Sequence, residues 1–207
     1  MSDKKYIALT FDDGPSDTTT RKVLDKLKKY DVIGSFFLIG DYIPGREDIV
    51  KEELDYGCDI QNHSLTHSDM RIFDADTIKA EIDETTRRIV AISGKEPTFF
   101  RPPYIYVNDL MMESIPLIFI SGYGCDDWVP EVGAAERAQK AIEGAKDGAV
   151  VLLHDLEGND ATVEALDTII PELKRQGYEF VTITELFKRA GINYSNAKKE
   201  VYSYTDQ

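Results

Sequence analysis

The sequence has no long hydrophobic run and few cysteines, and these two absences already exclude several classes of protein. Its longest apolar stretches, residues 115–120 and 149–153, are far shorter than the ~20 residues that span a bilayer, so we expect no transmembrane helix. The two cysteines, Cys58 and Cys125, cannot form a disulfide framework, and their separation does not match a metal site. We therefore expect both to be ordinary, partly buried thiols.

Basic residues and a hydrophobic leader are also scarce. Acidic residues outnumber Lys and Arg by 38 to 24, and the resulting net charge of −14 repels nucleic acids and anionic membrane surfaces. The amino-terminal MSDKKYIALTFDDG has only the short apolar run of residues 7–9 before polarity returns, so we expect it to lack the apolar segment of a signal peptide. We expect a monomer without nucleic-acid or membrane partners, either cytoplasmic or a module of a longer exported protein.

The length and the 42% of apolar residues fit one domain with a sizeable core. Repeats, low-complexity segments and long linkers are absent from the sequence, so nothing marks an internal boundary. We place this domain at residues 1–190. Residues 191–207, which are polar and contain three tyrosines, are expected to form a peripheral tail.

Strand-like and helix-like segments alternate along the chain, which indicates the α/β class. Short β-branched and aromatic segments predict strands at 6–11, 34–38, 59–62, 99–101, 117–120, 149–154 and 179–181. One-sided apolar patterns predict helices at 18–30, 76–93 and 161–176. About seven such pairs favour a distorted or incomplete (β/α) barrel of parallel strands, with a doubly wound sheet as the alternative. In both folds the active site lies at the carboxyl ends of the strands.

The residues best suited to chemistry follow the predicted strands. His63 and His67 come directly after the third strand, and His154, the last of the three histidines in the chain, ends the sixth. Other strand ends carry the sequences DDGP (12–15), RPPY (101–104) and DDW (126–128). Each motif alone has a structural interpretation, such as a turn for DDGP or a surface pair for two histidines four residues apart. Their coincidence at one edge of the fold favours an active site.

Taken together and in order, the motifs TFDDGP (10–15), HSLTH (63–67), RPPY (101–104), DDW (126–128) and LLHD (152–155) resemble those of the polysaccharide deacetylases, carbohydrate esterase family 4. The resemblance covers about residues 6–188. It implies a distorted barrel of about seven strands and a metal-dependent removal of acetyl groups from chitin, peptidoglycan or xylan.

Residue by residue, the resemblance implies that Asp13, His63 and His67 hold one divalent metal ion. One carboxylate and two imidazoles with open positions are typical of a catalytic site, most often for Zn²⁺, with Co²⁺ or Ni²⁺ as alternatives. The family pattern makes the neighbouring Asp12 the general base. Because side chains alternate along a strand, Asp12 and Asp13 are expected to point in different directions.

The remaining motif residues take supporting roles by the same resemblance. Arg101 would hold the base ionised and oriented, and the backbone N–H of Tyr104 would stabilise the oxyanion. His154 would be the general acid, and Asp127 would pair with it and keep it protonated. The side chains that would form the wall of the acetyl pocket are Trp128 and Leu152.

Two departures from the family pattern bear on the substrate. Gly124 stands where the family usually has an Asp three residues before Asp127, and a short segment, 108–113, replaces a longer helix after RPPY. The short segment and the sequence DDWVP are similar to the acetylxylan esterase members. They favour an acetylated polysaccharide substrate with O-acetyl esters of xylan, and the alternative is N-acetylglucosamine in peptidoglycan or chitin.

Two further hypotheses belong to other classes of protein. A carbohydrate-binding domain without catalysis would not need the two aspartates and three histidines at the strand ends. A phosphoesterase usually needs more carboxylates and a second metal ion than this set provides.

Overall fold

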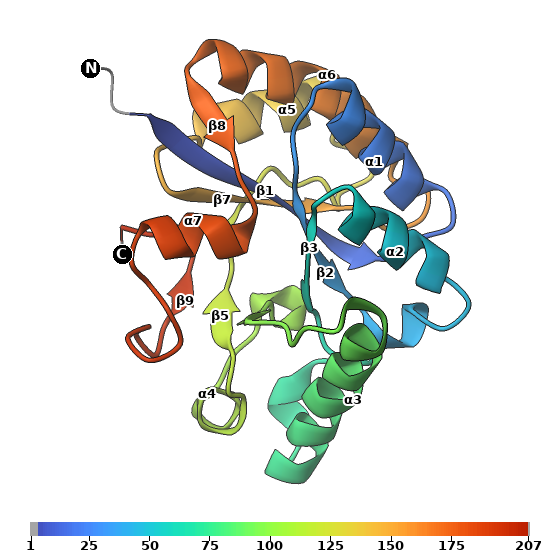
Figure 1. The fold of residues 1–207 in the computed structure, drawn as a ribbon, viewed down its shortest axis with the longest axis vertical. Helices are drawn as coiled ribbons and strands as arrows, with labels where there is room; N and C mark the ends of the chain where they lie inside the picture. The colour runs from blue at the N-terminus through green and yellow to red at the C-terminus, as the bar shows by residue number, and fades with distance from the viewer. Residues whose placement is uncertain (1–3, 207) are drawn as a thin grey trace.

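A curved parallel sheet surrounded by helices forms the molecule, and the computed structural model describes residues 4–206 of it (Figure 1). The strands follow the spatial order β6-β7-β1-β2-β3-β4-β5-β9, and β8 pairs with the start of β1. Because this order does not return to its first strand, the barrel is incomplete, as predicted. The strands are β1 (Lys5–Gly14), β2 (Ser35–Leu38), β3 (Asp59–Asn62), β4 (Phe99–Phe100), β5 (Ile118–Ile120), β6 (Tyr123–Gly124), β7 (Ala149–His154), β8 (Tyr178–Phe180) and β9 (Val201–Tyr202).

Helices cover the outside of the sheet, and α7 packs against β1 (Figure 1). The helices of the described residues are α1 (Thr19–Lys29), α2 (Glu47–Asp55), α3 (Ala75–Ser93), α4 (Asp109–Ser114), α5 (Ala134–Glu143), α6 (Asp160–Arg175) and α7 (Ile183–Arg189). Three of them, α1, α3 and α6, match the helices predicted from the apolar patterns to within two residues at each end.

The two faces of β1 lie in different environments because its side chains alternate. Ile7 and Phe11 pack in the cluster that the sheet forms with α1 and α6. Ala8 belongs to the cluster on the other face, which includes side chains of α7. Thr10 and Asp12 follow Ala8 at the same period of two. The side chains on this face of β1 therefore change from apolar to polar towards the carboxyl end of the strand.

Parallel pairing gathers the strand ends at one edge. In the β1–β7 ladder Asp12 lies opposite His154, and in the β3–β4 ladder Asn62 lies opposite Phe100. The residues that follow β1, β3, β4 and β7 therefore emerge side by side, which is why distant motifs meet.

Each of the seven predicted strands forms, and β3 and β7 have the predicted bounds. The strands β6 and β9 were not predicted. Each consists of two residues, and two residues are too few to show a period of hydrophobicity.

The expectation of a peripheral tail at residues 191–207 is wrong for its last part. Strand β9 pairs in parallel with β5, and Tyr202 is only 2% exposed. Beyond it, Val150 N–H donates a hydrogen bond to the Ser203 carbonyl, at 3.1 Å. An aromatic side chain in the interior and backbone groups that pair with the open edge of β5 explain why this segment packs as part of the barrel.

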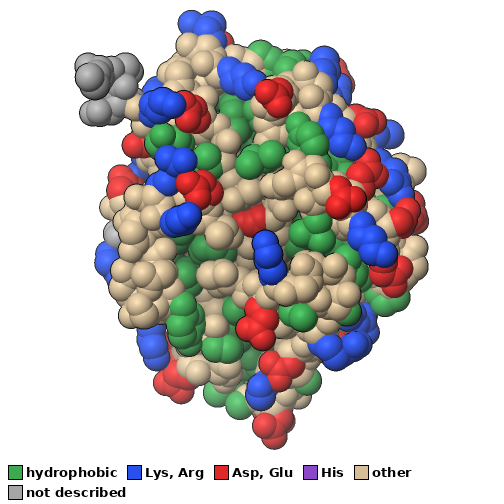
Figure 2. Space-filling model, viewed as in Figure 1, with side chains coloured by type: hydrophobic (Ala, Val, Ile, Leu, Met, Phe, Trp, Pro, Cys, Tyr) green, Lys and Arg blue, Asp and Glu red, His purple; other side chains and the backbone are tan. Residues whose placement is uncertain are grey.

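Acidic and basic side chains are intermingled over the face shown in Figure 2. Among residues 4–206, no helix combines the length and the hydrophobicity needed to cross a membrane.

Candidate active site

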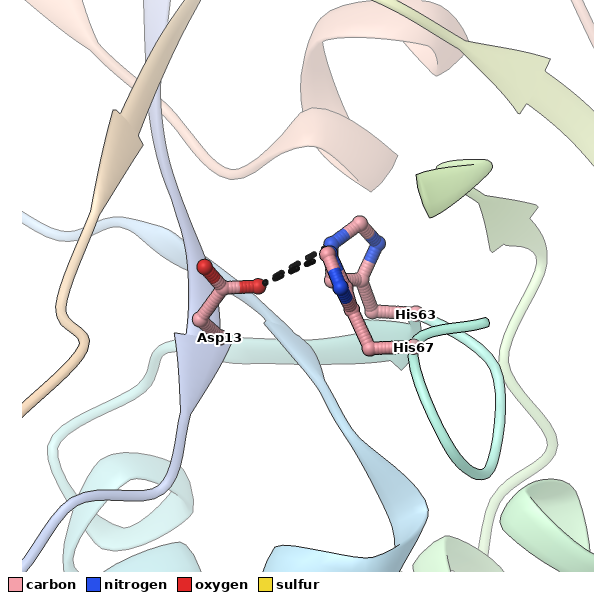
Figure 3. Close-up of side chains that lie close together, drawn as sticks. All are labelled: Asp13, His63 and His67. Atoms are coloured by element: carbon pink, nitrogen blue, oxygen red, sulfur yellow. Dashed lines mark ion pairs between the residues drawn. The ribbon is translucent and has the colours of Figure 1, made fainter. Parts of the chain in front are cut away.

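Asp13, His63 and His67 form a compact cluster at the carboxyl edge of the sheet. Asp13 lies in β1 and the two histidines follow β3, and the Asp13 carboxylate points towards both imidazole rings (Figure 3). Asp13 Oδ1 lies 3.3 Å from His63 Nε2 and 3.3 Å from His67 Nε2. The same buried oxygen has no hydrogen-bond partner within residues 4–206. One oxygen and two nitrogens therefore converge on a single point.

A bulge in β1 places Asp13 in this cluster. The ladder between β1 and β2 shifts register between Asp12 and Gly14, and Asp13 has a φ of 71°. The expectation that the two neighbouring aspartates point in different directions is therefore wrong. Asp12 Oδ2 lies 3.8 Å from His63 Nε2, so both carboxylates reach the same imidazole.

Unusual backbone conformations are concentrated around the site. Positive φ angles in non-glycine residues cost energy and persist only where the surrounding structure enforces them. Among residues 4–206, every non-glycine residue with a positive φ except Asp31 lies in a segment that forms the site. These residues are Asp13, Ser64, His67, Tyr104, Ile105 and Asp126.

Hydrogen bonds fix the His63 ring and the backbone of the loop that carries His67. His63 Nδ1 lies 2.7 Å from the Arg101 carbonyl oxygen, so Nδ1–H donates to it and Nε2 keeps its lone pair. His67 N–H donates to Ser64 Oγ at 3.0 Å, and Ser64 N–H donates to Asn62 Oδ1 at 2.8 Å. The loop after β3 is thereby built around its own polar side chains.

The cluster fits a divalent metal ion. Donor atoms bound tetrahedrally at about 2.0–2.1 Å lie about 3.3–3.4 Å apart, which agrees with both oxygen–nitrogen separations. Burial raises the pKa of Asp13, but the interaction with His63 and the charges of His63, His154 and His67 together outweigh burial and lower that pKa to about 2. Burial and the charge of His63 lower the pKa of His67. The carboxylate is therefore charged and His67 is neutral at neutral pH, as metal ligands must be. Burial opposes the charge of His63, but Asp12 and Asp13 outweigh it and raise the pKa of His63, so a cation competes with a proton for that imidazole.

Asp12 forms a buried pair with Arg101 beside this cluster. Arg101 Nη1 donates to Asp12 Oδ1 at 2.5 Å, and its Nη2 donates to Thr10 Oγ1 at 2.8 Å. The guanidinium carbon lies 4.2 Å from the centre of the Phe37 ring, and Arg101 is 0% exposed. The charge of Asp12 is thus paired, and one of its oxygens remains free to face His63.

His154 and Asp127 form a second buried pair. Asp127 Oδ1 lies 2.8 Å from His154 Nδ1, and Asp127 Oδ2 accepts from the His154 N–H and from Thr162 Oγ1. Arg137 donates in turn to Thr162 Oγ1. Burial opposes the charge of His154, but its hydrogen bond and charge interaction with Asp127 outweigh this and raise the pKa of His154 to about 9. The imidazole is therefore protonated at neutral pH.

A cavity of about 340 Å³ joins these groups. The ten site residues named from the sequence all belong to it or lie directly behind it. Asp12, Asp13, His63, His67, Tyr104, Trp128, Leu152 and His154 line the cavity. Arg101 and Asp127 are the buried partners of Asp12 and His154. The Tyr104 N–H makes no hydrogen bond with another of residues 4–206 and remains available to a ligand.

Gly124, where the family pattern has a carboxylate, packs against the wall of this cavity. A Cβ atom at this position would lie 3.2 Å from Trp128 Cζ3 and 3.3 Å from Leu152 Cδ2. Glycine therefore allows the indole to lie beside Leu152.

We expect Gly124→Ala to shift the indole by a few tenths of an ångström and to lower kcat/KM roughly two- to fivefold, because the added Cβ presses on a ring that is half exposed and can yield. Trp128 is the only tryptophan, so its intrinsic fluorescence reports the displacement directly. Gly133→Ala is a matched control, because a Cβ there meets no atom within 4 Å among the described residues. Unchanged fluorescence and activity in Gly124→Ala would contradict the packing role.

Sequence reasoning missed three polar residues that support the site. Thr10 receives a hydrogen bond from Arg101 and lies inside the motif TFDDGP, so the motif itself was a signal. Thr162 binds Asp127 from α6, and no motif surrounds it. Asp155 follows His154 and is fully buried, and burial raises its pKa to about 7.

Comparison with known protein families and proteins gives one consistent result. Residues 1–116 match the family model described as polysaccharide deacetylase. A bifunctional xylanase/deacetylase of Pseudobutyrivibrio xylanivorans is 46% identical over 201 residues, which are 97% of this chain and 33% of that protein. A peptidoglycan-N-acetylglucosamine deacetylase of Bacillus cereus is 36% identical over 195 residues, covering 90% of each chain.

Solved structures agree with this result. The Xyl-CE4 domain of a multidomain xylanase from the hindgut metagenome of Trinervitermes trinervoides has a TM-score of 0.95 and 42% identity, covering 99% of both chains. A family 4 acetyl xylan esterase from Clostridium thermocellum, in complex with a cobalt ion, has a TM-score of 0.92 and 40% identity, covering 97% of this chain and 98% of that one. This chain spans only 33% to 39% of the length of the first curated relatives that it matches.

Proposed function

The chain belongs to the polysaccharide deacetylase family, and on that premise we propose that it is a metal-dependent deacetylase that hydrolyses O-acetyl esters of xylan. One observation supports the chemistry above all. A candidate ligand set, a carboxylate–arginine pair and a protonated histidine–carboxylate pair all meet around one cavity.

In this proposal Asp13, His63 and His67 hold the ion, and Zn²⁺, Co²⁺ and Ni²⁺ all suit these donors. When bound, a divalent cation supplies Lewis acidity, which polarises the acetyl carbonyl and acidifies water. The hydrogen bond from His63 Nδ1 holds that ring in place, and the hydrogen bond from the His67 backbone N–H holds the loop that carries the second imidazole.

The protein's own groups then move the protons. Asp12, held by Arg101, removes a proton from the attacking water. The Tyr104 N–H donates a hydrogen bond to the acetyl oxygen as negative charge develops on it. Protonated His154 gives its proton to the departing sugar oxygen, while Trp128 and Leu152 enclose the acetyl methyl group.

The choice of xylan rests on the relatives whose names include a xylanase or an acetyl xylan esterase. Peptidoglycan deacetylases are also similar, with the Listeria monocytogenes enzyme 40% identical over 184 residues. The amide substrate is therefore the second candidate.

We expect wild-type protein to release acetate from acetylated xylo-oligosaccharides and from N-acetylated chito-oligosaccharides of equal length at different rates. The kcat/KM for the xylo-oligosaccharide should be at least about tenfold higher, because the expelled nitrogen of an amide needs more help from an acid than the oxygen of an ester does. Acetate release quantifies both reactions. A preference for the chito-oligosaccharide would assign the amide substrate instead. Phosphate release from phosphoesters without acetate release would point to a different metallohydrolase.

A further inference from the structure

Arg137 is a buried cation behind the pair of His154 and Asp127. It lies on α5, is only 2% exposed, and does not line the catalytic cavity. Helix α5 packs beside α6, the helix that follows β7 and His154 (Figure 1). None of the proton transfers described above uses Arg137, and it lies outside all five sequence motifs.

The hydrogen bonds of this guanidinium join two segments that surround the acid. Arg137 Nε donates to the Val132 carbonyl at 2.7 Å, and Nη2 donates to the Val129 carbonyl at 3.1 Å, both in the loop between β6 and α5. Arg137 Nη1 donates to Asn159 Oδ1 at 2.5 Å and to Thr162 Oγ1 at 2.9 Å, at the start of α6. One side chain thereby ties this loop to the first turn of α6.

Thr162 connects Arg137 to the carboxylate that holds the acid. Its hydroxyl oxygen accepts from Arg137 Nη1 and from Asn159 Nδ2, at 2.9 and 3.0 Å. Because a hydroxyl has two acceptor lone pairs and one proton, that proton is left for Asp127 Oδ2, at 2.8 Å. Asp127 in turn binds both the N–H and the Nδ1 of His154. The hydrogen bonds therefore run in one direction, from Arg137 through Thr162 to Asp127.

Within residues 4–206, the charge of Arg137 has no direct anionic partner, because its four hydrogen-bond acceptors are all neutral. A buried guanidinium is costly unless an opposite charge compensates it, and the first carboxylate along this chain of hydrogen bonds is Asp127. An apolar side chain of similar volume would avoid the cost, so packing alone does not explain a cation at this position. The cation favours the ionised form of Asp127 and fixes the carboxylate that orients His154.

We propose that Arg137 is a positioning residue for the general acid. It holds Asp127, and through Asp127 it holds the His154 imidazole in the orientation that proton transfer to the departing sugar oxygen needs. The inference rests on the proposed function, because that function assigns His154 its role as the acid.

The test compares two acetyl esters whose leaving groups differ in their need for an acid. The sugar of acetylated xylotriose leaves as a poorly stabilised alkoxide, whereas 4-nitrophenyl acetate expels a phenolate that is stable without a proton. In Arg137→Met, which keeps an unbranched side chain, we expect kcat/KM for xylotriose to fall roughly tenfold more than kcat/KM for the aryl ester. Arg175→Met is the matched control, because Arg175 is exposed on α6 and pairs with Glu172. The ratio of its two kcat/KM values should match that of the wild type.

A merely structural role has a different signature. A variant that only folds poorly loses the same factor on both esters, so an equal loss in Arg137→Met overturns the positioning role. Thr162→Val removes the hydroxyl between Arg137 and Asp127 and keeps the shape of the side chain. It should show the same selective loss on xylotriose, and an unchanged ratio in this variant also overturns the inference.

A double variant shows whether Arg137 acts through Asp127. In the Asp127→Asn background, Arg137→Met should lower kcat/KM for xylotriose by less than about twofold, because the charge that Arg137 holds is already gone. Losses that multiply instead would contradict the proposal. If wild type hydrolyses the aryl ester but no acetylated oligosaccharide, the proposed function itself fails, and this is seen before any variant is made.

Discussion

Asp12→Asn should retain the metal ion and lose roughly 100-fold or more in turnover, the usual contribution of a general base. Asp13→Asn should lose the metal ion as well as the activity. The two residues are neighbours in β1, but Asp12 has one oxygen paired with Arg101, whereas Asp13 Oδ1 faces both imidazoles. Metal content by elemental analysis, measured with acetate release, separates the two roles.

Chelation is the control for this pair of variants. Metal-free wild type should show no acetate release, and added Zn²⁺ or Co²⁺ should restore it. Full activity without metal would remove the basis for assigning ligands at all. Equal metal loss in both variants would mean that Asp12, 3.8 Å from His63 Nε2, is itself a ligand.

The positions of the three histidines could be found from sequence because they follow strands with clear patterns, and the family resemblance supplied their roles. His63 and His67 come after a four-residue strand of mostly buried side chains, and His154 ends the longest buried strand after β1. Parallel strands bring such ends together without further information. The order of motifs was therefore enough to place ten residues around one cavity.

Local backbone irregularities could not be found in this way. The bulge at Asp13 reverses the direction that strand alternation predicts, and alternation is the only rule that sequence supplies at that point. Thr162 supports Asp127 from a helix, where a polar residue facing the interior looks like any other threonine. The pairing of β9 with β5 depends on an open sheet edge that exists only once the barrel has formed.

The network behind His154 leads to a prediction about pH. Ordinary histidine has a pKa near 6.5, and the Asp127 pair raises that of His154 to about 9. A general acid works only while protonated, so the wild-type rate should fall as pH rises through about 9 and should be insensitive to this group at lower pH. Asp127→Asn removes the hydrogen-bonded charge that holds the proton, so burial is opposed only by the charges of Asp12 and Asp13 and lowers the pKa of His154 to near its ordinary value.

We therefore expect the alkaline limb of the pH–rate profile of Asp127→Asn to move down by two units or more. At about pH 8 the substitution lowers the protonated fraction of His154 from nearly all to a few per cent, which lowers kcat roughly 30-fold. Part of the activity is regained as the pH is lowered towards 6. Asp126→Asn is the matched control, because its exposed carboxylate contacts Lys140 and not the imidazole. A loss in Asp127→Asn that is the same at every pH would show that Asp127 only positions His154, and that the charge of the pair does not set the protonation of the acid.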